Sequence, residues 1–119
     1  MTLITHFNEI NAWQKAHELT LEIYEISQHF PKEELFCLTN QIRRCAISVP
    51  SNIAEGFARK SKIESLRFYN ISEGSLEELK YQLLLSRDLK YITIEKWEEL
   101  TTLANLTGKL LNGWMKIQK

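Results

Sequence analysis

Hydrophobic residues recur every three or four positions along most of this chain, which is the spacing of one face of an α-helix. Four stretches carry the pattern, and short segments with capping or helix-breaking residues separate them. The first stretch predicts a helix over residues 11–29, capped by Asn11 together with Gln14. Phe30-Pro31 ends it, since the residue before a proline avoids the helical region. Its repeating positions are Trp13, Ala16, Thr20, Ile23, Ile26 and Phe30.

The second stretch predicts a helix that begins after Pro31 and continues to about Ala58. Proline suits the first turn of a helix, and Glu33 and Glu34 favour a helix N-terminus through the helix dipole. The repeating positions are Leu35, Leu38, Ile42, Cys45, Val49, Ile53 and Gly56.

Pro50 lies inside this second stretch, where it removes the hydrogen bond to the carbonyl of Ala46. Such a proline costs about 3 kcal/mol in a plain helix and bends its axis. We expect Ser51 and Asn52 to satisfy the freed backbone groups. We interpret the bend as shaping the helix to its neighbours rather than as a moving hinge.

The third stretch starts with a capping box, Ser61 and Glu64, and predicts a helix over residues 62–90. Gly74 and Ser75 lie inside it in a patch of small residues, and a close crossing of two helices explains such a patch most simply. The predicted buried face consists of Phe68, Ile71, Ser75, Leu79, Leu83 and Ser86.

The fourth stretch follows Thr93, its expected cap, and has two adjacent hydrophobic stripes. Together they are wider than a bundle core usually requires, and such surplus apolar surface indicates a partner surface. The first stripe is Trp97, Leu100, Ala104, Thr107, Leu111 and Trp114, and the second is Leu103, Leu106, Leu110 and Ile117.

Four helices joined by short connections predict an all-α fold, an antiparallel up-down-up-down four-helix bundle. The length of 119 residues fits one domain over residues 1–119. With only 4 glycines and 2 prolines, a turn-rich β fold is disfavoured. A small elongated bundle has little core per residue, so we expect it to self-associate.

The composition also indicates a cytoplasmic protein. The chain has no run of about 18 apolar residues to span a membrane, and its first residues lack the pattern of a signal peptide. Cys37 and Cys45 are eight positions apart, which is roughly 12 Å along a helix and too far for a disulfide. We therefore predict two free thiols in a reducing compartment.

The sequence offers no pattern for catalysis, for a metal or for a cofactor. His6, His17 and His29 lack metal-ligand spacing, no G-x-S-x-G motif occurs, and the four glycines are isolated. We predict a protein that is not an enzyme and that uses no metal and no cofactor.

The chain has 15 basic and 15 acidic residues, so its net charge gives no reason to expect nucleic acid. Residues 40–62 nevertheless contain five basic residues and one acidic residue, Glu55. Two interpretations stay open. These residues contact nucleic-acid phosphates, with repetition in an oligomer joining them into one basic surface, or they pair with Glu73, Glu77, Glu78 or a neighbouring subunit. The five candidates are Arg43, Arg44, Arg59, Lys60 and Lys62.

Asn52 and Glu55 lie beside the hydrophobic stripe of the second stretch rather than opposite it. A half-buried carboxylate needs a partner, and Arg59 lies four residues further along the helix. We favour this structural role, and the alternative is a polar site shared between subunits.

Two blocks of the sequence form a specific combination, Q-x-R-R at residues 41–44 and N-I-A-E-G at residues 52–56. With the other blocks given below, they resemble the four-helix-bundle proteins encoded by intervening sequences in bacterial large-subunit ribosomal RNA genes. The resemblance covers essentially the whole chain, and Cys45 departs from it, because a small alanine is common there. The other blocks are Trp13-Gln14-Lys15-Ala16, Phe30-Pro31-Lys32-Glu33-Glu34, Phe68, Gly74-Ser75, Glu78-Leu79, Gln82-Leu83 and Leu89-x-Tyr91.

The resemblance implies a bundle that assembles as a homopentamer. It also implies RNA or another nucleic acid as a partner, because the related accessory protein of diversity-generating retroelements forms a basic pentameric barrel that binds nucleic acid and a reverse transcriptase. Our leading hypothesis is a non-enzymatic oligomer that binds structured RNA. The competing hypothesis is a scaffold for a protein partner, which would use the fourth stretch and the patch around Gly74.

Overall fold

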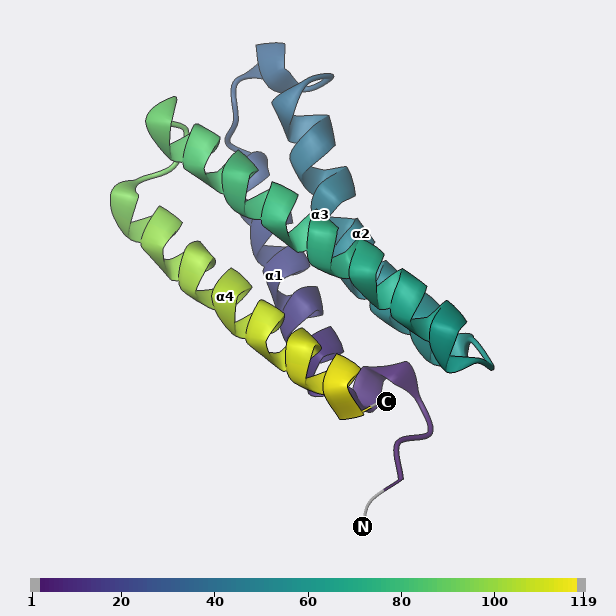
Figure 1. Ribbon diagram of the computed structural model, residues 1–119. Helices are drawn as coiled ribbons and strands as arrows, with labels where there is room; N and C mark the ends of the chain where they lie inside the picture. The colour runs from purple at the N-terminus through teal and green to yellow at the C-terminus, as the bar shows by residue number, and fades with distance from the viewer. Residues whose placement is uncertain (1–2, 118–119) are drawn as a thin grey trace.

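Four α-helices stand side by side in this protein and alternate in direction (Figure 1). The computed structural model describes residues 3–117, and within this range it contains no strand. The helices are α1 (Asn11–Ser27), α2 (Leu38–Ala58), α3 (Lys62–Asp88) and α4 (Ile94–Ile117), and two short 3₁₀-helices, η1 (Phe7–Glu9) and η2 (Lys32–Glu34), precede α1 and α2. The predicted all-α four-helix bundle is confirmed.

The helices form a closed ring in which each packs against two neighbours. Consecutive helices are in contact, and α4 returns to α1; across the diagonals, no close backbone approach occurs within residues 3–117. The bundle measures 46 × 26 × 19 Å, and its most extensive interface joins α2 and α3. The predicted stripes supply most of the core, in which Ile23, Ile42, Ile53, Leu79, Leu83, Leu100 and Leu111 are completely buried.

Two predicted core faces are wrong in part. Leu35 is half exposed, because it precedes the first turn of α2. In the first half of α3, Tyr69 and Ser72 are buried, whereas Ile71 faces outward. This half of α3 packs one position away from the predicted stripe, because the helical period of 3.6 residues drifts relative to a regular three-and-four spacing.

The helix predicted to begin directly after Pro31 is α2, and it begins at Leu38, seven residues after that proline. A single 3₁₀ turn, η2, follows Pro31, and Cys37 then takes a non-helical conformation with φ −122° and ψ −105°. The carboxylate of Glu34 accepts hydrogen bonds from the backbone N–H of Leu38 (3.3 Å) and from the hydroxyl of Tyr91 (2.8 Å). This carboxylate therefore caps α2 and ties its start to the α3–α4 connection.

Two of the three predicted N-terminal caps are confirmed. Ser61 Oγ accepts the N–H of Glu64 at 3.1 Å, and Thr93 Oγ1 accepts the N–H of Lys96 at 3.0 Å. Asn11 is not a cap, because it is already the first residue of α1. The amide of Gln14 instead donates to the carbonyl of Asn8, which holds η1 against the helix.

The carbonyl that Pro50 leaves without its helical partner is satisfied by another helix. Thr20 of α1 is buried, and its Oγ1 lies 3.0 Å from the oxygen of Ala46 and 2.9 Å from that of Ala16. The expectation that Ser51 and Asn52 would meet this need is therefore wrong for Ala46. The side-chain amide of Asn52 donates to the carbonyl of Ser48 instead.

Gly56, rather than Gly74, marks the close crossing of two helices. A Cβ atom on Gly56 would lie 2.5 Å from Cε1 of Tyr69 and 3.0 Å from the carbonyl oxygen of Ser65, both on α3. A Cβ atom on Gly74 would meet nothing within 4 Å, because Gly74 faces outward. Only the first of these glycines is required for the α2–α3 packing.

The Thr20 hydroxyl provides a test of how the bundle tolerates its internal proline. Thr20→Val keeps the shape of the side chain but removes the donor, so we expect the free energy of unfolding to fall by about 1–3 kcal/mol. In a Pro50→Ala background, the restored N–H at position 50 can donate to the carbonyl of Ala46. Thr20→Val should then lower the free energy of unfolding by less than it does in the unmodified protein. Urea unfolding of the four proteins measures the difference, and equal losses in both backgrounds would contradict the assignment.

Candidate nucleic-acid interface

The two adjacent arginines of α2 have different surroundings. Arg43 is half-buried; its Nε donates to Ser27 Oγ at 2.7 Å, and its guanidinium carbon lies 4.8 Å from the centre of the Tyr24 ring. Arg43 therefore joins α2 to the end of α1. Arg44 is exposed and takes part in no ion pair among the described residues.

At the other end of α2, Arg59 is also engaged within the chain. It forms an ion pair with Glu55, as predicted from their spacing, and its guanidinium carbon lies 5.1 Å from the centre of the Phe68 ring. Lys60 and Lys62 follow in the α2–α3 connection and the first turn of α3. Both are exposed, and neither has an ion-pair partner in residues 3–117.

Arg67 adds a basic side chain that sequence reasoning missed. It lies on α3 shortly after Lys62, is exposed, and has no ion pair within the described part of the chain. Its position just beyond the basic window of residues 40–62 kept it out of the predicted cluster. The α2–α3 end of the bundle therefore carries Arg59, Lys60, Lys62 and Arg67, and within residues 3–117 only Arg59 forms an ion pair.

The alternative partners predicted for these cations are not used. Among the described residues, none of the five predicted basic residues pairs with Glu73, Glu77 or Glu78. Glu77 pairs with Lys80 at 2.7 Å instead. Pairing of these basic residues with a neighbouring subunit stays a prediction.

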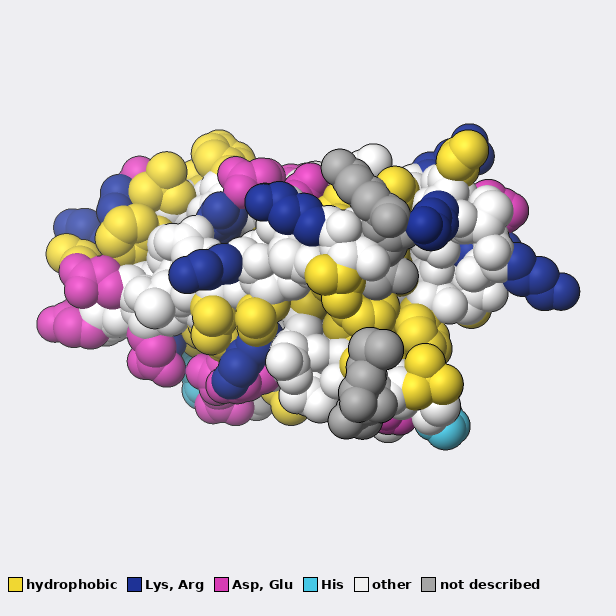
Figure 2. Space-filling view, turned by 60° about the horizontal axis from the view of Figure 1, so that its bottom comes forward, with side chains coloured by type: hydrophobic (Ala, Val, Ile, Leu, Met, Phe, Trp, Pro, Cys, Tyr) yellow, Lys and Arg dark blue, Asp and Glu magenta, His cyan; other side chains and the backbone are white. Residues whose placement is uncertain are grey.

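The basic residues of one chain form two separate groups. Arg44 lies on α2 and Arg59 directly follows its last residue, so the two are roughly 22 Å apart at 1.5 Å per residue. On the face drawn in Figure 2, lysine and arginine side chains are dispersed among acidic ones rather than gathered into a stripe. A continuous basic surface would therefore need more than one copy of the chain.

Asn52 and Ser75 belong to a polar seam between α2 and α3. Ser48 connects them, because its Oγ lies 2.9 Å from the amide nitrogen of Asn52 and 2.8 Å from Ser75 Oγ. The thiol of Cys45 donates to the carbonyl of Ser75 at 3.0 Å, and the hydroxyl of Ser72 donates to the carbonyl of Val49 at 2.7 Å. These contacts hold the two helices together, which supports the structural interpretation of Asn52 and Ser75.

Burial controls the chemistry of this seam. Loss of solvent around the Cys45 sulfur, and secondarily the nearby carboxylate of Glu78, raises the pKa of the thiol to about 12. The thiolate, which is the reactive form of cysteine, is therefore scarce at neutral pH. Cys37 lies at the start of α2 and is exposed.

Exposed hydrophobic side chains are not confined to α4. Leu103 and Leu110 of its second stripe are half-buried against the core, while Leu106 and Ile117 are exposed. Leu21 and Tyr24 on α1 and Ile47 on α2 are also exposed, on the two helices that Arg43 connects. Sequence reasoning missed these three because each lies outside the stripes that it followed.

Across residues 3–117, no group of three or more histidine, cysteine, aspartate or glutamate side chains has a geometry that could hold a metal ion. None of the described helices combines the length and the apolar character that crossing a membrane demands.

The comparisons with known proteins concern nearly the whole bundle. A family model described as 23S rRNA-intervening sequence protein matches residues 8–113. Among solved structures, the chain is similar to a crystal structure of a protein with unknown function from the S23 ribosomal protein family of Bacteroides thetaiotaomicron, with a TM-score of 0.81 and 25% sequence identity over 88% of this chain and 98% of that chain. No curated protein matches the chain.

The two cysteines should differ sharply in reactivity. We expect one thiol per native chain, Cys37, to react with an aromatic disulfide reagent at pH 8, because Cys45 is buried and its raised pKa keeps it protonated. In denaturant, both should react. Thiol titration of Cys37→Ser and Cys45→Ala variants assigns the two phases, and fast reaction of Cys45 in the native protein would contradict the buried seam.

Proposed function

Because this chain belongs to the 23S rRNA-intervening sequence protein family, we propose that it is a non-enzymatic, self-associating helical bundle that binds structured RNA. The observation that carries the proposal is a group of three cations at the α2–α3 end, Lys60, Lys62 and Arg67, that form no ion pair with any described residue. Cations without an internal partner are free to replace the counterions of a phosphate backbone.

The five predicted residues do not have equal roles in this proposal. Arg44, Lys60 and Lys62 contact phosphates. Arg43 and Arg59 act mainly as structural residues, since each is already held by a hydrogen bond or an ion pair and by an aromatic ring. Phosphate contacts carry no sequence information, so the proposed binding depends on RNA shape and charge rather than on base identity.

Self-association completes the proposed surface. A single chain is formally neutral and presents two separated basic groups, so a ring of copies, with the family resemblance favouring five, would place several α2–α3 ends near one RNA. The exposed side chains of Leu21, Tyr24 and Ile47 give the bundle apolar surface to bury between subunits. We propose Gly74, which leaves open space on α3, as a second contact.

The RNA hypothesis is tested by fluorescence anisotropy of a structured RNA across a salt series. Lys60→Glu with Lys62→Glu should weaken binding at least tenfold and flatten the salt slope, because each lost phosphate contact lowers the slope by about 0.7–0.9. Lys32→Glu with Lys109→Glu is the matched control, since it makes the same change in net charge at exposed lysines elsewhere. Equal losses in the two double variants, or no binding at low salt, would refute the site.

Self-association is tested by light scattering. We expect a mass of about five times the chain mass of 14.0 kDa, and Leu21→Glu with Ile47→Glu should reduce it by placing charges on the proposed apolar contact. Ile63→Glu with Ile94→Glu, at two exposed positions near the opposite ends of α3, is the matched control, because it adds the same charge, and should leave the mass unchanged. A mass of one chain for the unmodified protein at micromolar concentration would refute self-association.

A protein scaffold is the second candidate function, and the same exposed apolar side chains favour it. If the protein is a single chain in solution and binds no RNA, this surface needs another occupant. Specific capture of one protein, lost in the variant with charges at positions 21 and 47, would then support the scaffold.

A further inference from the structure

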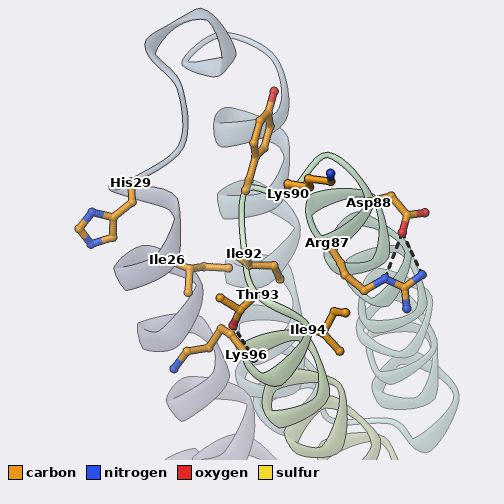
Figure 3. Close-up of a pocket in the computed structure, with 10 residues that line it drawn as sticks. Ile26, His29, Arg87, Asp88, Lys90, Ile92, Thr93, Ile94 and Lys96 are labelled. Carbon is orange, nitrogen blue, oxygen red and sulfur yellow. Dashed lines mark hydrogen bonds and ion pairs between the residues drawn. The ribbon is translucent and has the colours of Figure 1, made fainter.

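An open pocket of about 730 Å³ lies at the end of the bundle opposite the α2–α3 connection. It is formed where α1 ends, α3 ends and α4 begins (Figure 3). A volume of this size is within the range of small-molecule sites. The lining side chains are Ile26, His29, Arg87, Asp88, Lys90, Tyr91, Ile92, Thr93, Ile94 and Lys96.

The interior of the pocket is aliphatic. Ile26 on α1 is buried and points toward Ile92 of the α3–α4 connection (Figure 3). Ile92 is half-buried, and Ile94, at the start of α4, is exposed. An apolar ligand that packs against these side chains would remove their surface from water, which favours binding.

The polar lining carries more positive than negative charge. Arg87, Lys90 and Lys96 line the pocket, and Asp88 is the one carboxylate among the lining residues. Arg87 is held by Asp88 at 2.9 Å, and Lys96 lies 3.4 Å from Glu99 and 3.8 Å from Glu22. Lys90 has no ion pair among the described residues, so it is the cation available to a ligand.

Lys90 also has an unfavourable backbone conformation. Its φ is 65°, in the left-handed region, where it ends α3 in the position that glycine most often occupies. The N–H of Tyr91 bonds to the carbonyl of Ser86 at 2.9 Å across it. A residue with a Cβ atom is strained in this conformation, and glycine would avoid the strain. This conformation completes the C-terminal cap of α3 and fixes the position of Lys90 at the mouth of the pocket.

We infer that this pocket binds a small amphipathic anion, a carboxylate on an aliphatic body, with Lys90 as its counter-ion. The aliphatic body lies against Ile26, Ile92 and Ile94, and the carboxylate accepts hydrogen bonds from the Lys90 ammonium. A neutral head group lacks the ionic part of this interaction, and a cationic head group is repelled by the ammonium. The site is separate from the proposed RNA surface, which lies at the opposite end of α3.

Calorimetric titration with decanoate tests the site, with decanol and decylamine as neutral and cationic controls. We expect saturable binding of one decanoate per chain, at least tenfold tighter than either control. Binding of all three with similar affinity, or many weak sites for decanoate, would overturn the proposal. Association with phosphatidylglycerol vesicles without saturable decanoate binding would assign the anion to a lipid surface and also overturn it.

Lys90→Gly separates a binding role from a structural one. It removes both the charge and the strained backbone, so it should raise the unfolding temperature while weakening decanoate binding about tenfold. Lys90→Arg keeps the charge and should retain binding. Ile94→Asp, at an exposed position, should abolish binding without unfolding the protein. Unchanged decanoate affinity in Lys90→Gly and Ile94→Asp would refute the site, whatever the RNA measurements show.

Discussion

The close approach of α2 and α3 is the constraint on which the rest of the bundle depends. Tyr69 is almost fully buried and occupies the space that a side chain at position 56 would fill. The two helices then come near enough for the hydroxyl groups of Ser48 and Ser75 to form a hydrogen bond. A wider separation would break this hydrogen bond between two half-buried hydroxyl groups.

The same approach also sets the character of the candidate RNA-binding end. The end of α2 and the start of α3 are separated by a three-residue connection, so their cations project from one tip. Glu55 and Phe68 hold Arg59 from α2 and α3 respectively. The tip is thus built on two helix ends that the interface holds together rather than on a long loop.

Local features of the fold could be predicted from the sequence, and features that depend on distant residues could not. The caps at Ser61 and Thr93 and the Arg59–Glu55 pair follow from spacings of three and four residues. The start of α2 depends on Glu34 meeting Tyr91, 57 positions away. Periodicity identifies a glycine inside a helix but does not show which neighbour it faces, so the sequence indicates Gly74 for a close crossing that Gly56 makes.

The candidate site shows the same division. The basic cluster is visible in the composition, and the spacing already pairs Arg59 with Glu55, but the engagement of Arg43 depends on the packing of α1 on α2. Arg43 is engaged because Ser27 and Tyr24 of α1 lie beside it, and no spacing within α2 indicates either residue. Arg67 was missed because a window along the chain stops at the helix connection, whereas the molecular surface continues across it.

The Thr20 hydroxyl has a consequence for how the helices find their alignment. Hydrophobic stripes repeat, so α1 could slide along α2 by one turn, about 5.4 Å, and still bury aliphatic side chains. Only the native alignment brings a donor to the carbonyl of Ala46, and a shifted helix would leave that oxygen buried without a partner. The Thr20 hydroxyl thus distinguishes the native alignment of α1 and α2 from shifted ones in which the apolar packing would be nearly as good. Pro50 weakens α2, but by freeing the Ala46 carbonyl it also favours a single alignment of these two helices.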